Sequence, residues 1–337
     1  MPSTPDGFRI ACCPASGERR AARRGAAAAS VLFVVLALTG ACSGSGGTTA
    51  PAPAPTQPGP PPPPLVPPGV SPLVASMYQQ LPAYIASTLS DLQALLPNNP
   101  HNAPQINAKI SLLQRSTLAA EISEGRLFVE GSVSSSDGRG LGVAALFPEE
   151  RLRSEAVDAV RLLERALPVL ETFIATPFPT PAIRLWYGFK VGNSGGGGTL
   201  HMEDRGSYES RTPASRLPYD AILGHELAHS YIGNEILTQF LEMYVYNRLR
   251  GSGAALSSWT HTRGYNGISD ANVDSALTLD VYQLIGRDAM SRAYKAAYPL
   301  GPPYGQPLST VVIQVFVDQA SDQERSLVAT KLARITF

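Results

Sequence analysis

The sequence has no net charge, few cysteines and no internal repeat. Lys and Arg together number 27, and Asp and Glu also number 27. A nucleic-acid-binding surface needs clustered positive charge, so this balance argues against nucleic acid as a partner. Apolar residues make up 44% of the chain, which is enough for one or two packed domains.

Only three cysteines are present in 337 residues. Cys12 and Cys13 lie in an N-terminal segment that we expect to be removed as a signal peptide. Arginines precede its apolar core, residues 26–39, which is too short for a comfortable membrane span. Cys42 would then be the only cysteine left, and it could form no intramolecular disulfide.

The residues around Cys42 resemble a bacterial lipoprotein processing site. Gly40-Ala41-Cys42 follows the apolar core, although Thr39 stands where such sites prefer Leu. The resemblance implies cleavage before Cys42, lipidation of its thiol and an extracytoplasmic, membrane-anchored place in the cell envelope. An uncleaved anchor and an ordinary signal peptide are the alternatives. The Ser/Gly-rich and then Pro-rich residues 43–70 would form a semi-rigid spacer.

Histidine is also scarce, with five in the chain, yet two of them fall in His225-Glu226-Leu227-Ala228-His229. On a helix, side chains four residues apart lie on one face, so these two imidazoles can hold one zinc ion. Glu226 would lie beside a water on that metal and serve as its general base. Apolar residues on both sides of the pair, and the stop signal Gly233-Asn234, predict a buried helix of about four turns.

No third histidine follows at short range, so the third ligand is expected from the next helix, residues 235–249. Glu242 lies in an otherwise apolar run, where a carboxylate is costly unless it is paired or bound to metal. We therefore predict Glu242 as the third ligand. Glu235 lies close to the turn, and we interpret it as a first-turn carboxylate favoured by the helix dipole.

The segment from His225 to Asn234 resembles the H-E-L-A-H-x-W-F-G-N stretch of the gluzincin metallopeptidases, especially the aminopeptidase-N type. In that family a W-L-x-E-G-x-A segment supplies the third ligand, and residues 239–245 are similar, with Glu242 in the ligand place. The gap from His229 to Glu242 is shorter than in the family. A second alignment places Gln239, a poor zinc ligand, at that position.

Residues 195–204 resemble the G-x-M-E-N edge strand of the same family. Glycines such as Gly197 and Gly198 would let a substrate backbone approach, and an exposed edge could pair with an extended peptide. The resemblance assigns Glu203 to a free substrate amine and Tyr265 to the oxyanion, with His261, Tyr282 and Tyr304 as alternatives to the tyrosine. The run lacks a Gly-Lys-Ser/Thr ending, which argues against nucleotide binding.

These patterns predict an α+β fold with a zincin-like catalytic domain, in which a small sheet with a glycine-rich edge strand accompanies the zinc-binding helix. Mostly helical N- and C-terminal regions would flank it. Apolar residues at helical spacing predict helices near 72–96, 103–120 and 149–175, and residues 183–189 are predicted as a strand. Residues 311–317 are ambiguous between strand and helix. The expected regions are a signal peptide (1–41), a lipidated Cys with a linker (42–72), an N-terminal helical and strand region (73–147), a catalytic core (148–252) and a C-terminal helical region (253–337).

The resemblance implies a Zn²⁺-dependent peptidase acting on peptides or proteins, either as an aminopeptidase or as an endopeptidase. Two alternatives stay open. The chain could be an inactive zincin-fold lipoprotein that serves as a binding or scaffold module. It could also be a metal-dependent hydrolase of a non-peptide substrate.

Overall fold

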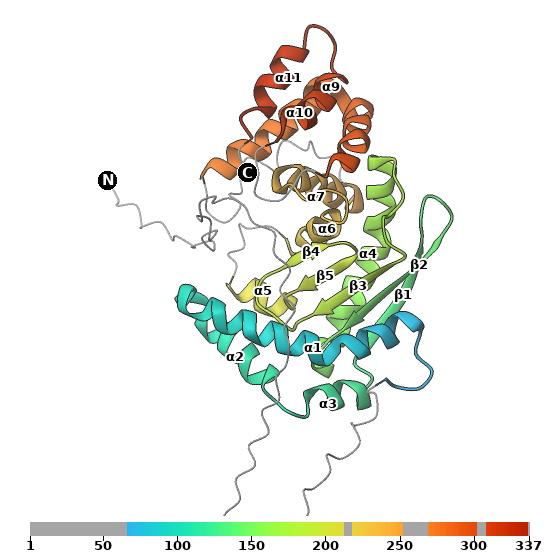
Figure 1. Ribbon diagram of the computed structural model, residues 1–337, viewed down its shortest axis with the longest axis vertical. Helices are drawn as coiled ribbons and strands as arrows, with labels where there is room; N and C mark the ends of the chain where they lie inside the picture. Colours follow the sequence, from blue (N-terminus) through green and yellow to red (C-terminus); the bar gives the residue numbers. More distant parts are fainter. Residues whose placement is uncertain (1–65, 212–217, 252–268, 302–307, 336–337) are drawn as a thin grey trace, which may run out of the picture. The chain divides into compact units, whose positions relative to one another are not determined.

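The computed structural model describes residues 66–211, 218–251, 269–301 and 308–335. These residues form a mixed α/β fold in which one small mixed sheet lies among many helices (Figure 1). The expected signal peptide, Cys42 and most of the linker lie outside the described residues. None of the described helices is long and apolar enough to cross a membrane. The region boundaries expected from the sequence, like the lipid anchor, stay predictions.

The helices follow one another along the chain with strands grouped in the middle. The α-helices are α1 (Pro72–Leu95), α2 (Ala103–Leu113), α3 (Leu118–Glu124), α4 (Arg153–Ile174), α5 (Arg205–Arg211), α6 (Tyr219–Ala228), α7 (Glu235–Leu249), α9 (Ser269–Ala297), α10 (Thr310–Val317) and α11 (Arg325–Leu332). The strands are β1 (Phe128–Ser134), β2 (Gly140–Leu146), β3 (Ala182–Tyr187), β4 (Ser194–Gly196) and β5 (Thr199–Met202).

The five strands lie in the order β1-β2-β3-β5-β4. The pairs β2–β3 and β3–β5 are parallel, and the outer pairs β1–β2 and β5–β4 are antiparallel. Helix α1 covers one face, where Leu73 lies against Gly142, and α4 covers the other, where Glu155 accepts a hydrogen bond from the Tyr187 hydroxyl at 2.8 Å (Figure 1). The central strands are therefore buried on both faces, as parallel strands require.

Several elements begin and end where the residue pattern places them. Helix α1, the long helix α4 and strand β3 match the predicted stretches within a few residues. The stretch 103–120 was expected as one helix, but α2 ends at Leu113 and α3 begins at Leu118. Residues 311–317, ambiguous in sequence, are helical because the Ser309 hydroxyl caps α10 by accepting from the Val312 amide.

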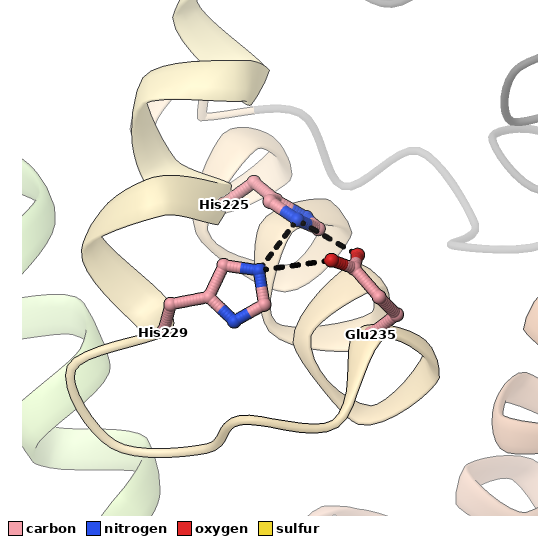
Figure 2. Close-up of side chains that lie close together, drawn as sticks. All are labelled: His225, His229 and Glu235. Atoms are coloured by element: carbon pink, nitrogen blue, oxygen red, sulfur yellow. Dashed lines mark hydrogen bonds and ion pairs between the residues drawn. The ribbon is translucent and has the colours of Figure 1, made fainter. Parts of the chain in front are cut away.

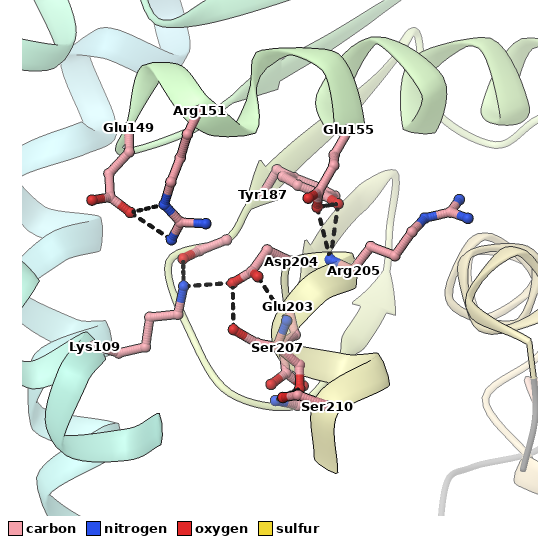
Figure 3. Close-up of polar contacts among 12 residues, drawn as sticks. Lys109, Glu149, Arg151, Glu155, Tyr187, Glu203, Asp204, Arg205, Ser207 and Ser210 are labelled. Carbon is pink, nitrogen blue, oxygen red and sulfur yellow. Dashed lines mark hydrogen bonds and ion pairs between the residues drawn. The ribbon is translucent and has the colours of Figure 1, made fainter. Parts of the chain in front are cut away.

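A buried ion pair ties α2 to the chain that follows the sheet (Figure 3). Lys109 Nζ lies 2.7 Å from Asp204 Oδ2 and also donates to the Gly188 carbonyl, with almost no solvent contact for either side chain. Asp204 also accepts from the amide and hydroxyl of Ser207. Desolvation raises the pKa of Asp204, but Lys109 and these hydrogen bonds outweigh it and lower the pKa. Since both charges are satisfied, the contact fixes the end of β5 relative to α2.

An aromatic cluster joins α1 to β3 and β5 on the face of the sheet that α1 covers. The Tyr84 ring stacks on Trp186 with centroids 4.0 Å apart, and its hydroxyl lies 3.1 Å from His201 Nδ1. Burial, with a smaller contribution from the Lys190 charge, lowers the pKa of His201 from 6.5 to about 4. The folded protein therefore favours the neutral ring.

This depressed pKa predicts a pH dependence of stability. Between about pH 6.5 and about pH 4 the unfolded chain binds a proton at His201 that the folded chain does not. The contribution of this residue to the free energy of unfolding is therefore fully present above the window and lost as the pH falls through it. We expect His201→Gln to flatten the pH dependence of urea unfolding in this window. Tyr84→Phe, which keeps the buried imidazole, should leave the slope in place, and an unchanged slope in His201→Gln would contradict the assignment.

Candidate metal centre

Helices α6 and α7 carry the chemically active side chains and pack against each other. His225 and Glu226 lie in the last turn of α6, and His229 is its C-terminal cap. The helix ends at Ala228, earlier than expected, and a short connection leads to Asn234. The Asn234 side chain caps α7 by accepting from the Leu237 amide at 3.1 Å, so Glu235 is the first residue of that helix.

Two imidazoles and one carboxylate converge on a single point (Figure 2). The Nε2 atoms of His225 and His229 lie 3.0 Å apart. Glu235 Oε2 lies 3.2 Å from His225 Nε2, and Glu235 Oε1 lies 3.4 Å from His229 Nε2. The side chains are nearly buried, with 1%, 10% and 8% exposure for His225, His229 and Glu235.

The outer ring nitrogens show where the protons lie. His229 Nδ1 lies 3.1 Å from the Ile232 carbonyl, which can only accept, so Nδ1 carries the hydrogen. His225 Nδ1 lies 2.8 Å from Glu242 Oε2; burial raises the pKa of this carboxyl, and the His225 imidazole opposes the increase. Both rings direct Nε2 toward the same point. Two bare lone pairs at 3.0 Å would repel each other, so the arrangement needs a shared proton or a metal cation between the two Nε2 atoms.

The charges around His225 favour such a positive charge. Burial alone would lower the pKa of His225, but the Glu235 and Glu242 carboxylates more than offset it and raise the pKa well above its ordinary value. The imidazoles have the converse effect on the pKa of Glu235. Burial would raise its pKa, yet the two imidazoles lower it to about 2. The cluster thus stabilises an anionic carboxylate beside a cation.

The donor set fits Zn²⁺. Two imidazole nitrogens and one carboxylate oxygen are ligands that zinc prefers, and tetrahedral ligands at zinc distances lie about 3.3 Å apart. The two Nε2 atoms lie 3.0 Å apart, and each lies 3.2 or 3.4 Å from a different oxygen of Glu235, so the separations are close to that spacing. Glu235 Oε2 is also buried and makes no hydrogen bond, although it lies 3.2 Å from His225 Nε2. A buried carboxylate oxygen left in this state is costly unless a cation satisfies it.

The carboxylate that lies beside the two Nε2 atoms is not the one that we predicted as the third ligand. Glu242 is buried, but it contacts Nδ1 of His225, on the side of the ring away from the cluster. Glu235, rather than Glu242, lies beside the two Nε2 atoms. The turn after His229 reverses the chain, and the Asn234 cap turns the first residue of α7 toward the end of α6. Gln239, the other alternative, lies one turn after Glu235 and is also buried.

Glu226 lies next to the cluster on α6 and is 5% exposed. Burial raises its pKa, the negative charge of Glu235 adds to the increase, and the two imidazoles oppose it. The net upward direction makes this carboxylate a better proton acceptor than an exposed glutamate. Such a shift beside a candidate metal site is typical of a catalytic base.

The glycine-rich segment forms the hairpin β4–β5, with β4 outermost in the sheet. A Cβ on Gly195 would lie 2.2 Å from the Glu226 carbonyl oxygen, so this glycine allows β4 to touch α6. A Cβ on Gly198 would lie 2.2 Å from Thr180 Oγ1, and its backbone amide donates to the Ser230 hydroxyl. Gly197 has φ +54 and open space around it. The hairpin is therefore shaped by its packing on α6.

The remaining predicted residues take other places. Glu203 is fully buried, and its Oε2 accepts from the Gly192 amide at 3.1 Å, so its carboxylate holds the turn before β4. Tyr265 lies outside the described residues, as do His261 and Tyr304. Tyr282 is half-buried on α9 beside Phe240, with ring centroids 5.3 Å apart.

No protein-family profile and no curated protein sequence matches this chain. Among solved structures, it is similar to an M1 zinc metallopeptidase from Deinococcus radiodurans at 12% identity and a TM-score of 0.42, over 62% of this chain and 53% of that one. It is also similar to Legionella pneumophila aminopeptidase A at 12% identity and a TM-score of 0.44, over 62% of this chain and 28% of that one. The chain thus spans about half of the first structure and about a quarter of the second.

The cluster predicts different metal affinities for two carboxylate variants. Glu235→Ala removes a donor and should lower Zn²⁺ affinity most. Glu242→Gln removes only the partner of the His225 Nδ1 proton, and a loss of about ten- to hundredfold is expected. Competition with a chromophoric chelator measures both, with exposed Glu209→Ala on α5 as the control. Retained affinity in Glu235→Ala together with complete loss in Glu242→Gln would restore Glu242 as the ligand.

Proposed function

We propose that this protein is a zinc-dependent hydrolase of peptide bonds, with His225, His229 and Glu235 as the metal ligands. The observation that carries the proposal is the convergence of two imidazole lone pairs and an unsatisfied carboxylate oxygen beside a buried glutamate. The choice of a peptide substrate rests on the resemblance of residues 225–234 to the gluzincin metallopeptidases.

The protein residues supply position and proton transfer. When bound, zinc would act as a Lewis acid toward water and a substrate carbonyl. Ile232, through its carbonyl, and Glu242, through its carboxylate, contact the Nδ1 atoms and so orient both Nε2 atoms toward the proposed metal position. Thr238 supports this arrangement because its hydroxyl donates to the Ile232 carbonyl at 2.9 Å.

Glu226 would act as the general base. Its carboxylate takes a proton from the water that attacks the peptide carbonyl and delivers it to the nitrogen of the leaving amine. The upward pKa direction suits both halves of this transfer. Tyr265 remains the proposed oxyanion donor on the basis of the sequence resemblance. Gly197 remains a candidate for substrate contact, whereas the buried contacts of Gly198 and Glu203 favour roles in packing.

The general base predicts a separation of metal binding from turnover. Glu226→Gln should lower the rate of peptide hydrolysis by at least about a hundredfold. Its zinc content should equal that of the parent, since Glu226 is not one of the three proposed metal ligands. Peptide-library cleavage and elemental analysis measure the two quantities. Full activity in the variant would refute the role of Glu226, and a parent protein without zinc would favour a non-catalytic binding module.

We also propose that the protein is anchored outside the cytoplasm through a lipid on Cys42, which rests on the sequence of the N-terminal segment. Cys42→Ala should move the protein from the membrane fraction to the soluble fraction or block its processing. Mass spectrometry of the mature N-terminus tests the modification directly. A mature chain without an acylated Cys42 would overturn this proposal and leave the metal centre untouched.

A further inference from the structure

A cleft lies between α4, α7 and α9, apart from the candidate metal centre. Its volume is about 410 Å³, and its lining residues are Pro168, Val169, Thr172, Tyr244, Arg248 and Arg287. Tyr244 follows Glu235 by nine residues on α7, which corresponds to about 13 Å along the helix axis. The cleft is thus separate from the histidine cluster, and its volume falls within the range of small-ligand pockets, about 300–1,000 Å³.

Two arginines are held against one tyrosine in this cleft. Arg287 Nε donates to the Tyr244 hydroxyl at 3.0 Å, and the Arg248 guanidinium lies over the Tyr244 ring, 5.3 Å from its centroid. Because the hydroxyl accepts from Arg287, its own hydrogen is left to donate to a ligand. The lining therefore offers two guanidinium groups, a phenol and the Thr172 hydroxyl within one cleft.

The backbone of α9 is bent directly before one of these arginines. Gly286 has φ 79° and ψ 172°, a conformation that is essentially restricted to glycine. A Cβ at Gly286 would meet nothing within 4 Å, so packing does not require a glycine there. The backbone bend itself requires it, and the bend sets the direction in which Arg287 leaves the helix.

The charge around the cleft is positive. None of the described residues that line it carries a carboxylate. Asp288 Oδ1 lies 3.7 Å from an Arg287 terminal nitrogen, but its side chain is 84% exposed.

We propose that this cleft binds an organic phosphate monoester. The dianionic phosphate would lie between Arg248 and Arg287 and accept from Tyr244, since guanidinium groups match phosphate oxygens in charge and geometry. A single carboxylate would neutralise only one of the two arginines. Pro168 and Val169 provide an apolar wall for the organic part of the ligand. The same chemistry is found in a soluble phosphate ester and in a lipid headgroup.

Isothermal titration calorimetry of the full-length protein with phenyl phosphate tests the site, with phenylacetate as the carboxylate control. Phenyl phosphate should bind more tightly than phenylacetate. The double variant Arg248→Gln/Arg287→Gln should weaken phosphate binding by about tenfold or more. Arg292→Gln removes the same charge from the same helix outside the cleft and should bind as the parent does. Asp288→Asn should strengthen binding, because it removes a carboxylate that lies beside Arg287.

Equal binding of the two probes, no binding of phenyl phosphate, or parent-like binding by the double variant would each overturn the proposal. A short-chain phosphatidic acid distinguishes the sources: tighter binding than phenyl phosphate indicates a lipid headgroup, and weaker binding indicates a soluble ester. The same titration of Glu235→Ala should still show phosphate binding. The cleft and the metal centre can therefore fail independently.

Discussion

The close approach of two imidazoles is the interaction on which the rest of the site depends. His225 and His229 direct their Nε2 atoms toward each other at 3.0 Å, and each ring is fixed through its other nitrogen. Such an arrangement is unfavourable in a neutral, empty interior, because two lone pairs and a carboxylate face one another. A cation shared among them would remove this cost, and this is the physical basis of the proposed metal site.

The fold holds this arrangement by packing α6 between the sheet and α7. On one side, Gly195 lets strand β4 approach the backbone of Glu226 closely. On the other side, α7 supplies both Glu235 and Glu242, one for each nitrogen of the His225 ring. A single helix therefore provides the proposed ligand, Glu235, and the carboxylate of Glu242 that contacts the other nitrogen of the His225 ring. The two roles are separated by two turns of that helix.

Much of the framework could be predicted from the residues. Helices α1 and α4 follow from apolar residues at helical spacing, and strand β3 follows from its apolar run. The break between α2 and α3 was not predicted, and no side-chain cap hydrogen bond marks the start of α3. The state of residues 310–317 was ambiguous because their apolar run suits a strand as well as a helix, and the Ser309 cap belongs to the helix. Glu203 shows the same limit, since its residue type suited a substrate contact, whereas burial gives it a structural partner.

The sequence by itself determined the pair of histidines and the neighbouring glutamate, because a spacing of four residues on a helix brings two side chains to one face whatever surrounds them. Only the tertiary structure decided which carboxylate joins them. Glu235 and Glu242 are both acidic, both on α7 and both buried, so composition and burial do not separate them. The path of the chain from His229 to Asn234 separates them, because it turns one glutamate toward Nε2 of His225 and the other toward Nδ1.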